Sequence, residues 1–163
     1  VRRADFDLLG QFEDPTGGWP NWDDVDFGYR ATRAGFSLQR SARAQAEHRD
    51  YSLADLATTC RRWERASHSA PRLLRKYPEL RSALPMFDDK GPIAWKTDPP
   101  PLVARKLVRW AASTALVVKS LERLAHTLEQ HWPVEPVLRR RDRLMIGADI
   151  YHGYQTGIKE LEC

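Results

Sequence analysis

Prolines divide this chain more sharply than any other feature of its sequence. Five of the eleven prolines fall between residues 85 and 101, and the run ends in Pro99-Pro100-Pro101. A proline has no backbone N–H to donate and its ring fixes φ, so this composition predicts an extended linker. We therefore expect four segments: residues 1–50, a helical segment at 51–84 that packs on them, the linker at 85–101, and a helical part at 102–163.

The segment after the linker carries apolar residues at helical spacing. This pattern predicts an amphipathic helix over residues 102–131, closed by Pro133 and Pro136. A last helix is expected over residues 142–161, interrupted by Gly147, Gly153 and Gly157. Two long helices that follow each other in sequence are expected to pair as an antiparallel hairpin.

The segment before the linker also has a helical pattern. Ser52 and Asp55 have the spacing of a capping box, which predicts a helix start there. Pro71 is expected to end or kink this helix, with a second short helix over residues 72–77. The predicted buried stripe consists of Leu53, Leu56, Ala57, Cys60 and Trp63.

The first fifty residues are organised around the acidic, aromatic stretch at 19–30. Asn21 or Asp23 can cap a helix there, and Gly35 is a typical C-terminal stop. Residues 36–40 alternate apolar and polar side chains, which predicts a short half-buried strand. The predicted fold class is therefore mostly α with a little β.

Three carboxylates in the stretch lie within four positions, at Asp23, Asp24 and Asp26. Like charges this close repel one another, so a fold that keeps them together usually provides a basic or cation-binding partner, often at a functional site. The alternative is structural, because acids in the first turn of a helix interact favourably with the positive end of its dipole. Spacing alone leaves both interpretations open.

The flanking residues carry a resemblance to a known family. Gly10-x-Phe12, the Asp-Asp-x-Asp-x-x-x-Arg pattern over residues 23–30 and Arg33-Ala34-Gly35-Phe36 occur in the order found in family 2 glycosyltransferases of the GT-A fold. The chain resembles the C-terminal, acceptor-side part of such an enzyme over residues 2–50. Residues 151–157 also look like the tyrosine–glycine pattern of some bacterial relatives.

The resemblance implies a C-terminal remnant of a GT-A α/β fold followed by a helical extension with an amphipathic hairpin. It implies inverting transfer of a sugar from a nucleotide-sugar donor to a glycan or a lipid-linked acceptor. The half that binds the nucleotide is expected upstream of this chain, so we expect the chain alone to be an inactive fragment.

The resemblance also assigns roles within the acidic stretch. The second acid of the pair, Asp24, is the expected general base, and Asp23 stands where many relatives carry glutamate. Aromatic rings offer sugars a flat apolar platform. The substrate-binding side is therefore assigned to two tryptophans and to a supporting acid–arginine pair: Trp19, Trp22, Asp26 and Arg30.

A divalent metal is the cofactor that the resemblance implies. Mn²⁺ or Mg²⁺ would hold the donor diphosphate, bound mainly by residues upstream of this chain. His48 matches a histidine that completes the metal site in some GT-A enzymes. The alternative for His48 is an ordinary surface or turn histidine.

The net charge of +4 and the pI near 9.3 suit acidic partners. Basic residues recur over residues 105–123 and 139–143. Three interpretations are open for them: a solvated helix face, docking on an anionic membrane, and binding of nucleic acid. We expect no nucleic acid partner, because acids are interleaved and no reading motif is present. The rival function is a non-catalytic helical module that binds an anionic membrane or a protein partner.

Hydropathy and cysteine content bear on location. No run of about 18 apolar residues is present that could cross a bilayer. Two cysteines cannot build a disulfide framework and weakly favour a reducing compartment. The expected location is the cytoplasm, with a peripheral place at the inner face of the membrane.

Overall fold

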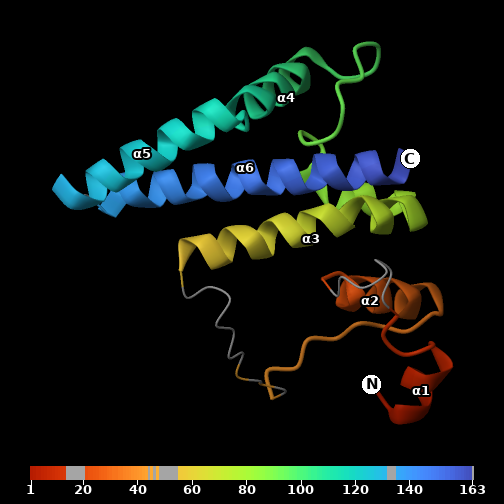
Figure 1. Ribbon diagram of the computed structural model, residues 1–163. Helices are drawn as coiled ribbons and strands as arrows, with labels where there is room; N and C mark the ends of the chain where they lie inside the picture. Colours follow the sequence, from red (N-terminus) through yellow and green to blue (C-terminus); the bar gives the residue numbers. More distant parts are fainter. Residues whose placement is uncertain (14–20, 44, 46, 48–54, 132–134, 163) are drawn as a thin grey trace.

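The computed structural model describes residues 1–13, 21–43, 45, 47, 55–131 and 135–162. Over these residues the protein is mostly helical, as predicted (Figure 1). In chain order the elements are α1 (Arg3–Leu8), α2 (Asp23–Arg33), α3 (Leu56–Lys76), the 3-10 helices η2 (Pro78–Ala83) and η3 (Pro85–Phe87), α4 (Pro100–Ala112), α5 (Ala115–His131) and α6 (Glu135–Glu162).

The β part of the prediction is wrong for the described residues, none of which forms a strand. Residues 36–40 have no regular secondary structure, and Leu38 is largely exposed. Alternation of apolar and polar side chains produces a strand only where a neighbouring strand supplies hydrogen bonds and a core covers the apolar face.

The helices are arranged around α6. Figure 1 shows α3 along one side of α6 and the α4–α5 segment along the other, with α2 and α1 beyond α3. The expected hairpin partner α5 does pack on α6, but the main partner of α6 is α3. The sequence pattern did not indicate that pairing, since nothing local to either helix specifies it.

Two glycines bring α3 and α6 into backbone contact. A Cβ added at Gly153 would overlap the backbone carbonyl of Glu64, and one at Gly157 would overlap the carbonyl of His68. These glycines do not interrupt α6, which runs unbroken from Glu135 to Glu162. The expected interruption is therefore wrong, because close packing against α3 compensates for the low helix propensity of glycine.

The core next to this contact is small and partly aromatic. Phe87 stacks on Tyr154 with ring centroids 4.9 Å apart, and Ala70 and Leu74 of α3 complete the cluster. Phe87 belongs to η3 and is only 1% exposed, so the proline-rich stretch contributes to the core.

Helix α3 differs from its prediction in two ways. It continues through Pro71 to Lys76, so the expected break and second short helix are wrong. Ala70, Pro71 and Leu73 are buried, and the packing of α3 outweighs the loss of one backbone hydrogen bond. Of the expected stripe Cys60 is buried, but Leu56 is only half-buried, and Ala57 and Trp63 are exposed.

Asp55 is the N-cap of α3, and its Oδ1 accepts a hydrogen bond from the backbone N of Thr58 at 2.7 Å. Ser52, the other half of the expected capping box, lies outside the described residues, as does Leu53. The predicted helix start is therefore confirmed, with Asp55 as the N-cap residue.

The helix expected over residues 102–131 is two helices, α4 and α5, separated at Ser113 and Thr114. The hydroxyl of Ser113 donates to the carbonyl of Trp110 and that of Thr114 to the carbonyl of Ala111, both at 2.9 Å. Such side-chain bonds compete with the helical ladder. The last helix begins earlier than expected, at Glu135, because Pro136 is tolerated in a first turn.

The glycine contact can be tested by Gly157→Ala. The added methyl group must push α3 and α6 apart, so we expect the free energy of unfolding to fall by about 3 kcal/mol. Gly147→Ala in the same helix is the control, because its Cβ would meet only the flexible end of Arg109 at 3.2 Å. The control should be neutral or raise stability by up to about 1 kcal/mol. Denaturant unfolding measures both, and equal effects would contradict the contact.

Candidate active site

The first turn of α2 is held on α3 by Trp22. Its indole Nε1 donates to the carbonyl of Ala66 at 2.7 Å, and its ring packs edge-on against Phe87 with centroids 5.8 Å apart. Its backbone carbonyl accepts the first helical hydrogen bond, from the N of Asp26 at 2.8 Å. Trp22 therefore anchors the start of the helix, and its use as a sugar platform stays a prediction.

Asp24 is the most exposed of the three acids. It lies in the first turn of α2, and its Oδ1 accepts a hydrogen bond from the backbone N of Val25 at 2.8 Å. Asp23 precedes it and is half-buried. The turn thus presents a carboxylate to solvent from a backbone position that Trp22 fixes on α3.

Asp26 has the opposite environment, because its side chain is completely buried. Its carboxylate accepts hydrogen bonds from Arg30 Nε at 2.8 Å and from Lys76 Nζ at 2.9 Å. Burial alone raises the pKa of Asp26, but the hydrogen bonds from Lys76, Arg30 and Tyr77 outweigh it and hold the pKa below its ordinary value. Asp26 therefore stays ionised inside the protein.

Arg30 and Lys76 extend this ion pair to the N-terminal segment. Arg30 donates to the backbone carbonyls of Leu9 and Gln11, the latter at 2.6 Å. Lys76 also bonds Glu13 at 3.1 Å. Burial lowers the pKa of Lys76, but its hydrogen bonds to Asp26, Tyr77 and Glu13 raise it above the ordinary lysine range. One buried carboxylate thus ties α2 to the end of α3 and to the turn after α1.

A cluster of three phenylalanines supports the same junction. The ring centroids of Phe6, Phe12 and Phe27 lie 5.1 to 5.3 Å apart, and the guanidinium of Arg30 lies 5.6 Å from the Phe27 centroid. Aromatic pairs at these separations add to the stabilisation from burial. Phe12 therefore serves packing against α2.

The far end of α2 stops at Gly35, as predicted. Gly35 has φ of +85°, and its N donates to the carbonyl of Thr32 at 3.1 Å. The N of Phe36 donates to the carbonyl of Ala31 at 3.0 Å, which completes a Schellman motif. The Arg-Ala-Gly-Phe segment of the resemblance thus forms a helix stop whose positive φ favours glycine.

A shallow groove of about 560 Å³ lies along the C-terminal half of α2. Tyr29 packs on Tyr77 with centroids 4.5 Å apart and donates its hydroxyl hydrogen bond to Glu79. Glu79 also lies 3.9 Å from Arg33. Because these polar groups pair with one another, the groove reinforces the docking of α2.

The residues assigned to the site separate into three groups. Asp24 is exposed and Asp23 is half-buried, while Trp22, Asp26 and Arg30 hold α2 in place. Trp19 and His48 lie outside the described residues. Sequence reasoning missed Lys76 and Glu13, because no pattern local to either residue links it to Asp26. Within the described part of the chain, no group of three or more His, Cys, Asp or Glu residues is placed to hold a metal ion.

Comparisons with protein-family models, with curated proteins and with solved structures find no match to this chain.

Asp26→Asn tests the buried ion pair. It leaves Arg30 and Lys76 without their shared carboxylate, so we expect the free energy of unfolding to fall by about 3 kcal/mol at neutral pH. Asp24→Asn is the matched control, and loss of its favourable place near the helix N-terminus should cost about 0.5 kcal/mol. Equal losses in denaturant unfolding would contradict the burial of Asp26.

The lowered pKa of Asp26 also predicts how stability depends on pH. A carboxylate whose folded pKa lies below its unfolded value of about 3.9 stabilises the protein above that pH. The contribution is lost as the pH falls through the folded pKa. The stability difference between the wild type and Asp26→Asn should therefore shrink on acidification below pH of about 4. Unfolding measured at a series of pH values checks this, and a pH-independent difference would contradict it.

Proposed function

We propose that this chain is the acceptor-side part of an inverting family 2 glycosyltransferase of the GT-A fold. It acts in the transfer of a sugar from a nucleotide-sugar donor to a hydroxyl of a glycan or a lipid-linked acceptor. Asp24 is the general base. The observation that carries the proposal is the contrast between exposed Asp24 and buried, doubly paired Asp26 within one helical turn.

The contrast gives the acidic pattern two separate tasks. A general base must be reachable by its substrate and must be held in one position. Asp26 cannot be reached, because its side chain has no exposed surface. Asp24 can be reached, and the anchors at Trp22 and Asp26 lie two residues away on each side of it. If the acids served only to interact with the helix dipole, the buried ion pairs of Asp26 with Arg30 and Lys76 would not be needed.

The chemistry assigned to Asp24 is a single proton transfer coupled to substitution. Its carboxylate takes the proton of the acceptor hydroxyl as that oxygen attacks the anomeric carbon of the donor. The bond from the anomeric carbon to the diphosphate oxygen breaks, and the nucleoside diphosphate leaves with the electron pair. Attack from the face opposite the leaving group inverts the anomeric configuration. Asp23, beside the base, offers a second carboxylate to hydrogen-bond the acceptor.

The donor side is assigned to residues that this chain does not contain. The described residues offer no group suited to Mn²⁺ or Mg²⁺, so no step of the reaction is assigned to a metal here. Such a metal, when bound by the donor half, would neutralise the diphosphate as it leaves.

The base is tested by Asp24→Asn in a protein that joins this chain to its donor-binding half. We expect turnover to fall by about 100- to 10,000-fold, because the amide cannot accept the proton, while donor binding is kept. Asp5→Asn, the same change in the first turn of α1, is the control and should keep turnover. Retained turnover in the Asp24 variant would contradict the assignment of Asp24 as the general base.

The division between donor and acceptor sides predicts the behaviour of the chain alone. Isothermal calorimetry should detect no binding of a nucleotide sugar to these 163 residues, with or without Mn²⁺. The joined protein should bind the same nucleotide sugar and serves as the positive control. Binding by the chain alone would place donor contacts within it and contradict the division.

A further inference from the structure

Lys106 and Arg109 of helix α4 pair with the preceding proline-rich stretch, while several of its large apolar side chains face outward. Lys106 is 6% exposed, and its Nζ donates to Asp98 at 2.6 Å and to the carbonyl of Pro92 at 2.7 Å. Arg109 Nε donates to Asp89 at 3.0 Å. A surface helix of a soluble protein normally turns its apolar stripe to the core and its charges to water. Here the ion pairs bind α4 to the preceding proline-rich stretch.

Several large apolar side chains face solvent along the α4–α5 segment. We call its large exposed side chains the outer ridge, which consists of Leu107, Val108, Trp110, Leu116 and Leu124. Val108 is 67% exposed and Leu116 is 78% exposed. Single exposed apolar residues are common, but a series along two consecutive helices marks an interaction surface. Figure 1 places these helices at the outside of the molecule, on the side of α6 opposite α3.

Positive charge accompanies the outer ridge. Residues 102–143 contain nine lysines and arginines against four aspartates and glutamates, while the whole chain has a net charge of only +4. Arg105 on α4 and Lys119 and Arg123 on α5 are exposed. Lys119 and Arg123 follow Leu116 by three and seven residues, so they share its side of α5.

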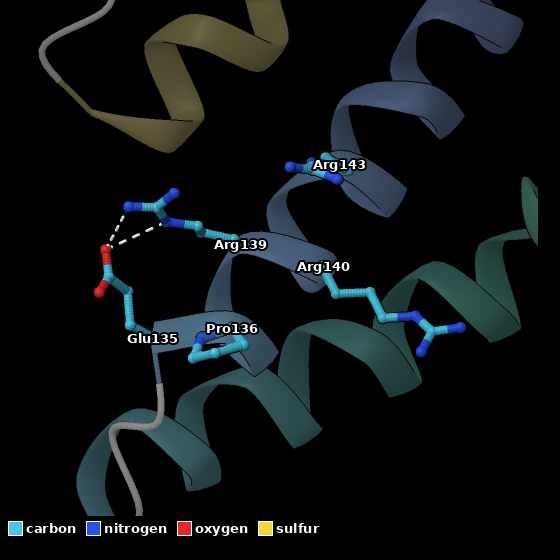
Figure 2. A pocket seen from close by; sticks show the side chains of 5 residues that line it. All are labelled: Glu135, Pro136, Arg139, Arg140 and Arg143. Atoms are coloured by element: carbon cyan, nitrogen blue, oxygen red, sulfur yellow. Dashed lines mark hydrogen bonds and ion pairs between the residues drawn. The ribbon is translucent and has the colours of Figure 1, made fainter.

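The start of α6 adds further arginines beside a shallow cleft of about 540 Å³ (Figure 2). Arg139 bonds Glu135 at 3.0 Å. Arg140 points to the opposite side of the helix from Arg139 in Figure 2. The positive field around the α4–α5 segment is therefore reinforced from α6.

We propose that the outer ridge and its basic neighbours dock this protein on an anionic bilayer surface. The apolar side chains would enter the boundary between head groups and acyl chains, where a tryptophan such as Trp110 is favoured. Lys119, Arg123 and Arg105 would meet the lipid phosphates. Among the residues that the structure describes, none of the helices could span a bilayer. Apolar and basic side chains together on one side would place the segment in the interface plane.

The positive charge and the apolar ridge together favour an anionic bilayer over a second copy of the chain or nucleic acid. A second copy would bring the same positive field to the same face, and the two would repel. Nucleic acid would match the charge but not the outer ridge, which offers no polar groups to phosphates or bases. An anionic bilayer satisfies both the apolar and the basic part. The proposal stands apart from sugar transfer and needs no catalytic activity for its test.

Co-sedimentation with lipid vesicles tests the docking. The chain should sediment with vesicles of phosphatidylcholine and phosphatidylglycerol in equal parts. It should not sediment with phosphatidylcholine alone, and raised salt should weaken binding. Val108→Ser with Leu116→Ser should weaken binding by at least about tenfold. Lys119→Gln with Arg123→Gln should weaken it by roughly 25-fold, at about fivefold for each charge.

Matched controls lie in the N-terminal part of the chain. Leu38→Ser with Leu8→Ser removes apolar side chains that are 69% and 78% exposed. These exposed fractions match those of Val108 and Leu116. Arg2→Gln with Arg40→Gln removes two exposed charges. Both controls should bind as the wild type does, and circular dichroism should show every variant folded.

Three outcomes would overturn the proposal. They are absence of binding to the anionic vesicles, equal binding to both kinds of vesicle, and binding that the ridge and charge variants leave unchanged. Light scattering provides a separate check. A dimer that the Val108→Ser and Leu116→Ser changes dissociate would assign the outer ridge to a second copy of the chain.

Discussion

The close approach of α3 to α6 is the constraint on which the rest of the structure depends. Gly153 and Gly157 allow the two backbones to touch at Glu64 and His68. The contact brings Tyr154 against Phe87, so the core forms where the helices meet the proline-rich stretch. Without this contact α3 would lose its main packing partner, and α2 is in turn bonded to α3.

The candidate active site is built on α3 in turn. Trp22 binds α3 at Ala66, and Asp26 binds it at Lys76, near its C-terminal end. A buried carboxylate is costly unless it is fully paired, and here two cations and a tyrosine supply the pairing. The paired Asp26 is buried, while Asp24 lies at the surface. Asp26 therefore has a structural role, and Asp24 is the acid to which the proposed chemistry is assigned.

The α4–α5 segment differs from α2 in that several of its large apolar side chains are exposed. Its polar contacts are internal, with Lys106 and Arg109 paired to Asp98 and Asp89. The large apolar side chains of its outer ridge are exposed. An acceptor-side module with a surface of this kind would act beside a membrane, which fits the lipid-linked class among the proposed acceptors. The two proposals are independent, since one depends on the first turn of α2 and the other on the outer ridge.

The sequence alone determined what local interactions decide: the mostly helical content, the start of α2 near Asp23, the Asp55 cap and the stop at Gly35. Caps, dipoles and positive φ act within a few residues, so a pattern reveals them. Only the tertiary structure decided which acid is buried, because Lys76 lies 50 residues from Asp26. It likewise decided that α3 continues through Pro71, that the α6 glycines are contacts, and that residues 36–40 form no strand. Burial depends on distant segments, whose pairing no local pattern encodes.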